Sequence, residues 1–303
     1  MFYSNLLETL SCIENKFSFW NLTFISKYAQ NENESKLYIE VLNILLSKIK
    51  IDNVNISFGA EFIEKCLSLE DVPFELITEA YLFTNKHEQH FDYKNEIFKQ
   101  LVERDFNVLF EFLDFNSKDR ISYHDLIHED FEFIWKLDNY QEIIEAIFNY
   151  FLDSNAYYFS EKAINAFFPK DKGVLDNKAI DFIKSMLINH FDNDKYIKVI
   201  FNIICYSYPY LRDEFLDIFL KLNKNFDLFK RIELVRRTHS YSGSFIPILE
   251  NDKFSWQRIL SVIQNLPNGL NYIEHKDYVA KEIHYCELRI KQEMKSEFLS
   301  DFR

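Results

Sequence analysis

Two histidines four residues apart have the spacing that comes closest to a metal or catalytic site. On a helix, His124 and His128 would lie on one face, as in helices that ligate zinc through two imidazoles. Metalloproteases of this type place Glu directly after the first histidine, because that carboxylate activates the metal-bound water. Here the residue is the shorter Asp125, and a third ligand is not evident, although Asp130 and Glu132 are near. The pattern is more typical of a solvated helix start, so a metal-dependent hydrolase centred on His124 and His128 stays an alternative.

A calcium-binding loop can be laid over Asp114 to Asp125, but its chemistry does not fit. Lys118 would place an ammonium group where calcium requires an oxygen ligand, and Asp119 replaces the glycine that makes the sharp turn. A polar turn is the better interpretation of this segment.

The one dense basic run of the chain leads into a loop of small residues around Gly243. Backbone amides in such a loop can hold an anion, but no lysine follows the glycine as it does in a phosphate-binding loop. The four glycines of the chain also supply no GxxxxGK[ST], GxGxxG or GxSxG motif. We therefore favour a helix whose C-terminal cations complement its dipole. For the chain as a whole, we predict no cofactor, no metal and no catalytic residue. The run consists of Lys230, Arg231, Arg236, Arg237 and His239.

The charge balance argues against several classes of partner. The 303 residues include 35 Lys and Arg against 48 Asp and Glu, a formal net charge of -13. An acidic surface repels phosphate backbones and anionic lipid, so we expect neither nucleic acid nor a membrane as partner. The four cysteines lie far apart and form no CxxC, and neither a secretory signal nor a run of 18 apolar residues is visible. These features predict a soluble, cytoplasmic protein.

Apolar residues recur with helical spacing along most of the chain. Strict alternation is hard to find, and only 4 Gly and 5 Pro are present to make tight turns. Asp176 and Asp194 each precede an apolar stripe, where a carboxylate can cap the first turn of a helix. The links between the stripes are short, which favours antiparallel neighbours. Apolar stripes lie around Ile143, Ile147, Ile183, Ile197, Phe215, Trp256 and Val279.

We therefore predict an all-α fold, an irregular α-solenoid of stacked antiparallel helix pairs with no sheet of note. None of the polar breaks in the chain is long enough to separate independent domains. We expect one continuous helical-repeat region over residues 1–303, with a soft joint near residues 114–124.

Several short motifs in the C-terminal half resemble one known class of protein when they are taken together and in order. They are Phe133-Ile134-Trp135 with the segment 138–144, Phe226-Asp227-Leu228-Phe229-Lys230, Ser242 to Pro247 with Trp256, His275-Lys276-Asp277-Tyr278, and Glu293 to Leu299. Residues 130–303 resemble the C-terminal helical region of large bacterial signal-transduction NTPases of the NACHT-like class, several of which act in defence against phage. The resemblance implies a helical-repeat sensor that binds a trigger protein and relays the event to an NTPase core. The chain has no nucleotide-binding or effector domain, so the resemblance implies a fragment or a split relative, and no catalytic residue is carried over.

The sequence thus favours a non-catalytic recognition module that binds a protein partner, either a phage-derived trigger or an NTPase core. Two alternatives stay open, namely the hydrolase described above and a structural spacer between domains. Aromatic and basic side chains near the loop around Gly243 are the predicted contacts with the partner. They are Arg236, Arg237, Tyr241, Phe245 and Trp256.

Overall fold

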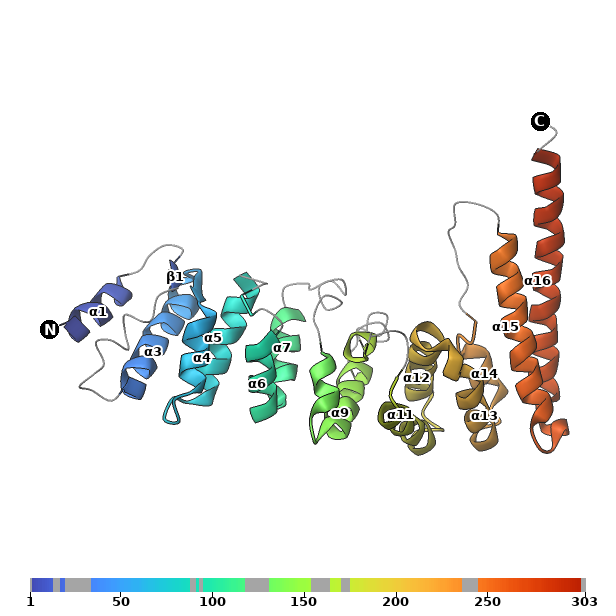
Figure 1. Ribbon diagram of the computed structural model, residues 1–303, viewed down its shortest axis with the longest axis horizontal. Coiled ribbons are helices and arrows are strands. Elements are labelled where there is room, and N and C mark those ends of the chain that lie inside the picture. Colours follow the sequence, from blue (N-terminus) through green and yellow to red (C-terminus); the bar gives the residue numbers. More distant parts are fainter. Residues whose placement is uncertain are drawn as a thin grey trace. The chain divides into compact units, whose positions relative to one another are not determined.

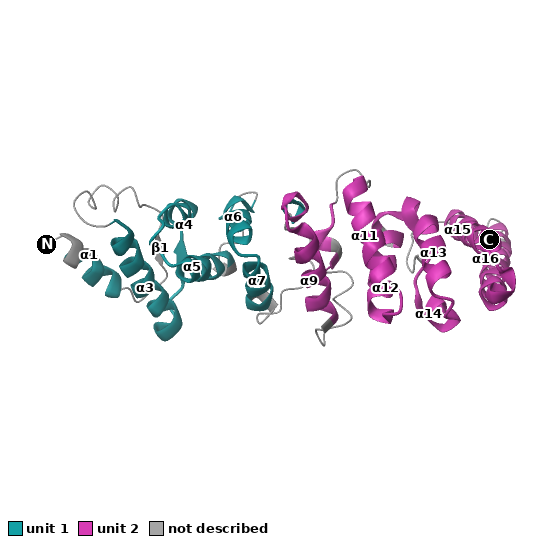
Figure 2. Cartoon of the chain, turned by 90° about the horizontal axis from the view of Figure 1, so that it is seen from below, with its two compact units in different colours: residues 1–133 teal, residues 134–303 magenta. Residues whose placement is uncertain are grey.

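The chain folds into two compact units, residues 1–133 (unit 1) and residues 134–303 (unit 2), shown in two colours in Figure 2. The prediction placed a soft joint near residues 114–124, whereas the boundary between the units lies between Phe133 and Ile134. This computed structural model describes residues 2–12, 17–19, 34–87, 91–92, 95–117, 131–153, 164–169, 175–235 and 245–300. Within these ranges nearly all regular structure is helical, which confirms the all-α prediction (Figure 1).

Unit 1 consists of six described α-helices and one short pair of strands. The strands are parallel, with Phe17 opposite Ile56 and Phe19 opposite Phe58. The second strand is fully buried, and its Phe58 N–H donates to Thr84 Oγ1 at 2.9 Å. A helix side chain thus satisfies a strand amide in the core, as burial requires. The elements are α1 (Phe2–Ser11), β1 (Phe17–Phe19), α3 (Glu34–Asp52), β2 (Ile56–Phe58), α4 (Ala60–Leu67), α5 (Phe74–His87), α6 (Glu96–Arg104) and α7 (Asn107–Ser117).

A buried carboxylate fixes the start of α6. Asp92 accepts hydrogen bonds from Ile97 N–H at 3.0 Å and Phe98 N–H at 2.8 Å, and Tyr81 Oη donates to it at 3.2 Å. Burial raises the pKa of Asp92, and these three donors oppose the rise. Asp92 therefore ties α6 to α5 inside the aromatic core, where the rings of Tyr81 and Phe98 stack.

Unit 2 is built from helices whose apolar stripes lie in the core, as their spacing predicts. Ile143, Ile147, Ile183 and Ile197 are all fully buried. α15 and α16 lie side by side, run in opposite directions and are joined by a short turn (Figure 1). The elements are η2 (Glu132–Lys136) at the boundary, α9 (Tyr140–Asp153), η3 (Asn165–Phe167), α11 (Asn177–Asn189), α12 (Asp194–Ser207), η5 (Pro209–Leu211), α13 (Arg212–Leu222), α14 (Phe226–Arg231), α15 (Ile246–Asn265), η6 (Gly269–Tyr272) and α16 (Ile273–Ser300).

One of the two predicted helix caps is confirmed, and the other lies one residue away. Asp176 caps α11 by accepting from Ala179 N–H at 2.7 Å. At the start of α12 the cap is Asn193, and Asp194 is the first helical residue. A carboxylate in the first turn still complements the helix dipole from that position.

None of the helices in the described ranges is long and apolar enough to cross a membrane.

Candidate functional site

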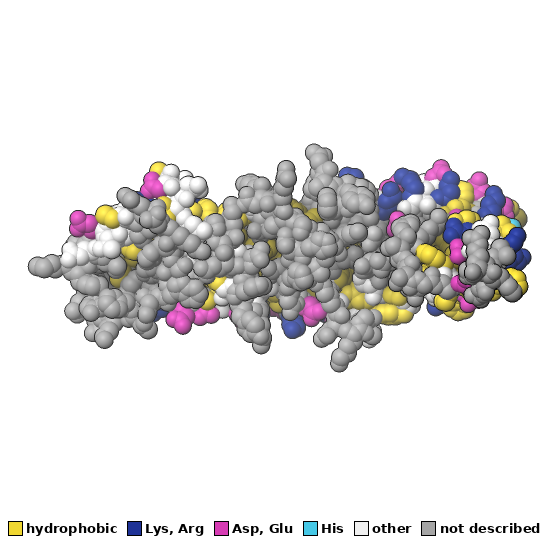
Figure 3. Space-filling model, turned by 90° about the horizontal axis from the view of Figure 1, so that it is seen from above, with side chains coloured by type: hydrophobic (Ala, Val, Ile, Leu, Met, Phe, Trp, Pro, Cys, Tyr) yellow, Lys and Arg dark blue, Asp and Glu magenta, His cyan; other side chains and the backbone are white. Residues whose placement is uncertain are grey.

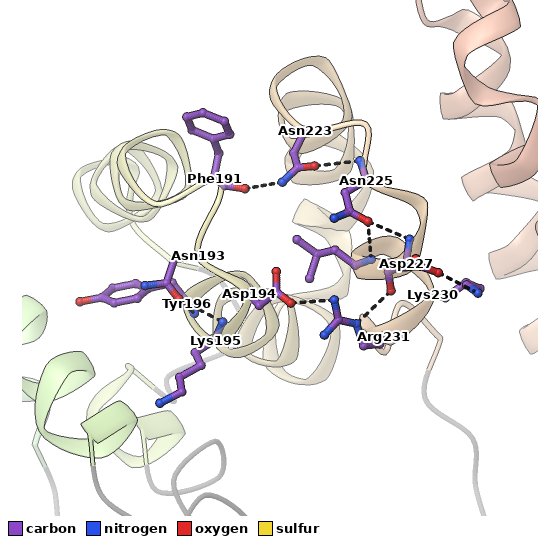
Figure 4. Close-up of polar contacts among 11 residues, drawn as sticks. Phe191, Asn193, Asp194, Lys195, Tyr196, Asn223, Asn225, Asp227, Lys230 and Arg231 are labelled. Atoms are coloured by element: carbon purple, nitrogen blue, oxygen red, sulfur yellow. Dashed lines mark hydrogen bonds and ion pairs between the residues drawn. The ribbon is translucent and has the colours of Figure 1, made fainter.

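The same cap geometry occurs at two consecutive turns of unit 2. Asn193 Oδ1 accepts from the N–H groups of Lys195 at 3.1 Å and Tyr196 at 3.4 Å (Figure 4). Thirty-two residues later, Asn225 Oδ1 accepts from the N–H groups two and three positions ahead, at 2.9 and 3.1 Å. Each asparagine satisfies amides that the first turn of a helix leaves free. The α11–α12 and α13–α14 turns are therefore built alike.

One side chain joins these two turns directly. Asn223 Nδ2 donates to the carbonyl oxygen of Phe191 at 2.7 Å, and Asn223 Oδ1 accepts from Asn225 N–H at 2.8 Å (Figure 4). Phe191 and Asn223 are also 32 residues apart, each two positions before its cap. The repeated spacing places the two turns next to each other in the same orientation relative to their helices.

Ion pairs link the helices that begin at these turns. Arg231 on α14 pairs with Asp194 on α12 at 2.7 Å, and its Nε also donates to the carbonyl oxygen of Asp227 at 3.0 Å (Figure 4). A hydrogen bond links α12 to α9 in turn: Lys195 Nζ donates to the carbonyl oxygen of Leu152, the second-last residue of α9, at 3.0 Å. Because both side chains are about half exposed, the ion pair of Arg231 and Asp194 adds little stability.

A third turn lies against the same end of α13. Tyr272 Oη in η6 donates to the carbonyl oxygen of Leu220 in the last turn of α13 at 2.7 Å. The ring of Phe226, directly after the α13–α14 turn, contacts the ring of His275, at a centroid distance of 5.2 Å. The α15–α16 turn thus adjoins the α13–α14 turn. We call the three adjacent turns, 190–193, 223–225 and 266–272, with their flanking residues Ile188, Leu222 and Ile273, the turn edge.

The turn edge exposes large apolar side chains. Turns at the surface are normally polar, so a group of exposed aliphatic and aromatic residues here is a candidate site. In Figure 4 the ring of Phe191 points away from the helices. The side chains and their exposed fractions are Ile188 (48%), Phe191 (37%), Leu222 (41%), Leu270 (84%) and Ile273 (50%).

Behind the turn edge, one histidine is enclosed by aromatic rings. His275 is 1% exposed, and neither of its ring nitrogens has a hydrogen-bond partner. Its ring lies 4.8 Å from Phe229, 5.2 Å from Phe226 and 5.5 Å from Tyr272 between centroids. Burial without a compensating charge lowers the pKa of His275 to about 4. We call Phe226, Phe229 and Tyr272 the aromatic box.

Motifs that are far apart in the sequence meet at the aromatic box. Phe226 and Phe229 belong to the segment 226–230, and His275 and Tyr278 to the segment 275–278. Tyr278 contacts both phenylalanines, and Trp256 packs edge-on against Tyr278 at 6.0 Å. These motifs therefore share a structural role in attaching α15 and α16 to α14.

The thiols with a resolved shift lie in settings that keep them protonated. Burial raises the pKa of Cys205 to about 12 and raises that of Cys66 further, so neither is a thiolate near neutral pH. In the described part of the chain, no group of three or more His, Cys, Asp or Glu residues could hold a metal ion.

Of the sequence-predicted contact residues, only Phe245 and Trp256 lie within the described ranges, and neither belongs to the turn edge. His124, His128, Arg236, Arg237 and Tyr241 lie outside the described residues. Phe245 is half-buried directly before α15. Trp256 is 6% exposed and contributes to the core, which leaves almost none of its surface available to a partner.

The sequence contains a local signal for two residues of the turn edge. Phe191 stands between His190 and Asp192, and Leu270 between Gly269 and Asn271. A large apolar residue among polar neighbours in a turn is a candidate for exposure, although Leu266 and Tyr272 in the third turn are buried.

The charge of the chain is divided unequally between the two units. Unit 1 holds 12 basic and 24 acidic residues, a net charge of -12, whereas unit 2 holds 23 basic and 24 acidic residues, a net charge of -1. Figure 3 shows Lys and Arg side chains interspersed with Asp and Glu on the visible face of the part that ends in α15 and α16. The turn edge thus belongs to the electrostatically neutral unit.

Comparisons of this chain with protein-family models, with curated proteins and with solved structures find no match.

Proposed function

We propose that this chain is a non-catalytic recognition module, an irregular α-solenoid of stacked antiparallel helix pairs, that binds a protein partner. The observation that carries the proposal is the turn edge, where five large apolar side chains are exposed on three adjacent turns and the helix ends beside them. Two turns built alike at a spacing of 32 residues support a degenerate helical repeat, the kind of architecture that offers extended contact surfaces.

The turn edge has the physical properties of a protein-binding surface. Its turns are held by side-chain caps and by the bonds of Asn223 and Tyr272, so they lose little conformational freedom on binding. Aromatic and aliphatic anchors near the centre of a patch, surrounded by polar groups, supply most of the binding energy in protein interfaces. Phe191 and Leu222 are such anchors, with Asn223 between the two turns.

The partner we propose follows from the NACHT-like resemblance of residues 130–303. In this view the chain is the sensor part of a bacterial defence NTPase, present as a fragment or split relative. It acts in the cytoplasm, binds a protein trigger such as one derived from phage, and signals to an NTPase core. The aromatic box supports a mechanical connection, because it joins α14 to α16 through residues of two resemblance motifs.

Affinity capture with matched variants tests the proposal. The tagged full chain would be expressed in bacteria with and without phage infection, beside Phe191→Asp with Leu270→Asp, and captured proteins would be identified by mass spectrometry. We expect a trigger or an NTPase to be captured by the wild type and lost with the double variant. Ile51→Asp is the control, because Ile51 is 80% exposed on α3 of unit 1. Capture of the same proteins by the double variant would contradict a role for the turn edge.

The alternatives make different predictions in the same experiment. A structural spacer would capture no separate protein under either condition. A hydrolase centred on His124 and His128 depends on residues outside the described ranges, and no observation on the described residues favours it.

A further inference from the structure

The turn edge is suited to contact with a second copy of this chain. We propose that two copies associate through their turn edges about a two-fold axis that passes between the α11–α12 and α13–α14 turns. This inference rests on the proposed function, because it takes from it that the turn edge binds a protein, and it names a second copy of this chain, beside the trigger or NTPase core, as a protein that this surface binds. It follows from how charges and apolar groups are arranged on these two turns.

Net charge restricts where two copies of this chain can meet. Each copy carries a formal charge of -13, and unit 1 accounts for -12 of it. Contact through unit 1 would bring two strongly acidic surfaces together, which opposes association. Contact through unit 2, whose net charge is -1, avoids most of this repulsion. Self-association is therefore compatible with a surface on unit 2, and the turn edge is an apolar surface there.

The exposed charged residues of the two turns are opposite in sign, and each stands close in sequence to one member of the apolar pair. Asp192 follows Phe191 on the first turn, and Lys224 lies two residues after Leu222 on the second. Both side chains are exposed, and within the described part of the chain neither forms an ion pair. Asp194 and Arg231 nearby already pair with each other. Asp192 and Lys224 are thus left available for a charge on another molecule.

A two-fold axis between the turns makes this arrangement complementary to itself. The axis exchanges the two turns, so Phe191 of one copy meets Leu222 of the other, and the reverse contact forms at the same time. The same rotation places Asp192 of one copy opposite Lys224 of the other, twice. Apolar contacts at the centre with two ion pairs at the rim are the usual layout of a protein interface.

Sedimentation velocity and light scattering on the full chain test this inference. We expect a concentration-dependent dimer for the wild type and for Ile51→Asp. Phe191→Asp changes two contacts in each dimer, so its dissociation constant should rise on the order of 100-fold. Leu222→Asp, on the other member of the apolar pair, should have the same effect, and helix content by circular dichroism verifies that both variants fold.

Charge reversal gives the sharper measurement. Asp192→Lys alone would set cations against Lys224, and Lys224→Asp alone would set carboxylates against Asp192, so each should weaken the dimer by roughly tenfold. The double variant Asp192→Lys with Lys224→Asp exchanges the two charges and should restore the affinity of the wild type. Weakening by each single change followed by recovery in the double variant is expected only if these two positions face each other.

Three results would overturn the inference. A wild type that stays monomeric up to about 100 µM forms no self-interface of standard size. A dimer that persists in Phe191→Asp uses another surface. If the dimer of the double variant dissociates as readily as those of the single variants, Asp192 and Lys224 do not face each other across a two-fold axis. A monomeric wild type whose capture of another protein still depends on the turn edge would leave the proposed function in place, so the two failures are distinguishable.

Discussion

The enclosed histidine gives a direct test of the packing behind the turn edge. His275 is buried among the aromatic box with both ring nitrogens unpartnered. Replacing it with leucine removes the polar groups and keeps an apolar side chain of similar size in the same place. At pH 7 the imidazole is neutral in the folded chain, and an unpartnered buried polar group costs about 1–3 kcal/mol. We therefore expect His275→Leu to be at least as stable as the wild type at pH 7.

The larger effect is on the pH dependence of the free energy of unfolding. The pKa of His275 is lowered to about 4 by burial, while histidine in an unfolded chain titrates near 6.5. As the pH falls from 6.5 toward 4, the unfolded chain binds a proton that the folded chain does not, so unfolding becomes more favourable. The gap between the two pKa values, at about 1.4 kcal/mol per unit, amounts to roughly 3 kcal/mol lost across this window. His275→Leu should lose none of it.

Urea titrations at several pH values between 7 and 4 measure this difference. Trp256 packs against Tyr278 beside the aromatic box, so in a background of Trp20→Phe and Trp135→Phe its fluorescence reports the unfolding of this region. His284→Leu is the matched control, because His284 lies on the same helix and its side chain is 69% exposed. The reasoning is refuted if the wild type and His275→Leu lose stability in parallel as the pH falls.

Three further changes test the contacts that shape the two units. Asn225→Ala should lower the free energy of unfolding of unit 2 by about 1 kcal/mol, because the first amides of α14 lose their cap, and thermal unfolding measures the loss. Asp92→Ala should destabilise unit 1 by roughly 2–4 kcal/mol, because two buried amides of α6 and a tyrosine hydroxyl lose their acceptor; the expectation fails if the melting temperature is unchanged. The pKa of Glu111 is raised by burial and by the nearby carboxylates of Asp105 and Glu75, so Glu111→Gln should raise the melting temperature slightly, and the gain should shrink as salt is added.

Helical spacing was sufficient to predict most of the fold, because burial of one face is a local property of the sequence. Ile143 and Ile147 are buried as their spacing requires, and Asp176 caps its helix. The strands β1 and β2 could not be predicted in this way, since three residues are too few to show alternation. Their pairing joins residues 39 positions apart, such as Phe17 and Ile56, and the amide of Phe58 bonds to the distant Thr84. At α12, Asn193 and Asp194 are both good capping residues, and only the path of the turn decides between them.

The candidate site was harder to predict, because exposure depends on tertiary packing. Trp256 and Leu222 both belong to apolar stripes, yet Trp256 lies in the core and Leu222 is exposed at the end of its helix. Nothing local distinguishes these two positions. The sequence predicts contacts at the basic run with Arg236 and Arg237 because a cluster of charges is easily recognised in a sequence. The turn edge, in contrast, is assembled by hydrogen bonds between residues that are 32 and 52 positions apart.

The turn edge is difficult to explain by folding alone. Asn193, Asn223 and Asn225 already satisfy the backbone of its first two turns, so these turns do not need Phe191 or Leu222 to hold their shape. Leu270 is 84% exposed and therefore adds little burial to the core. Polar residues at these positions would cost the fold little and would reduce the risk of aggregation. Apolar side chains on rigid turns, where they are not needed for stability, are consistent with a surface that another protein covers.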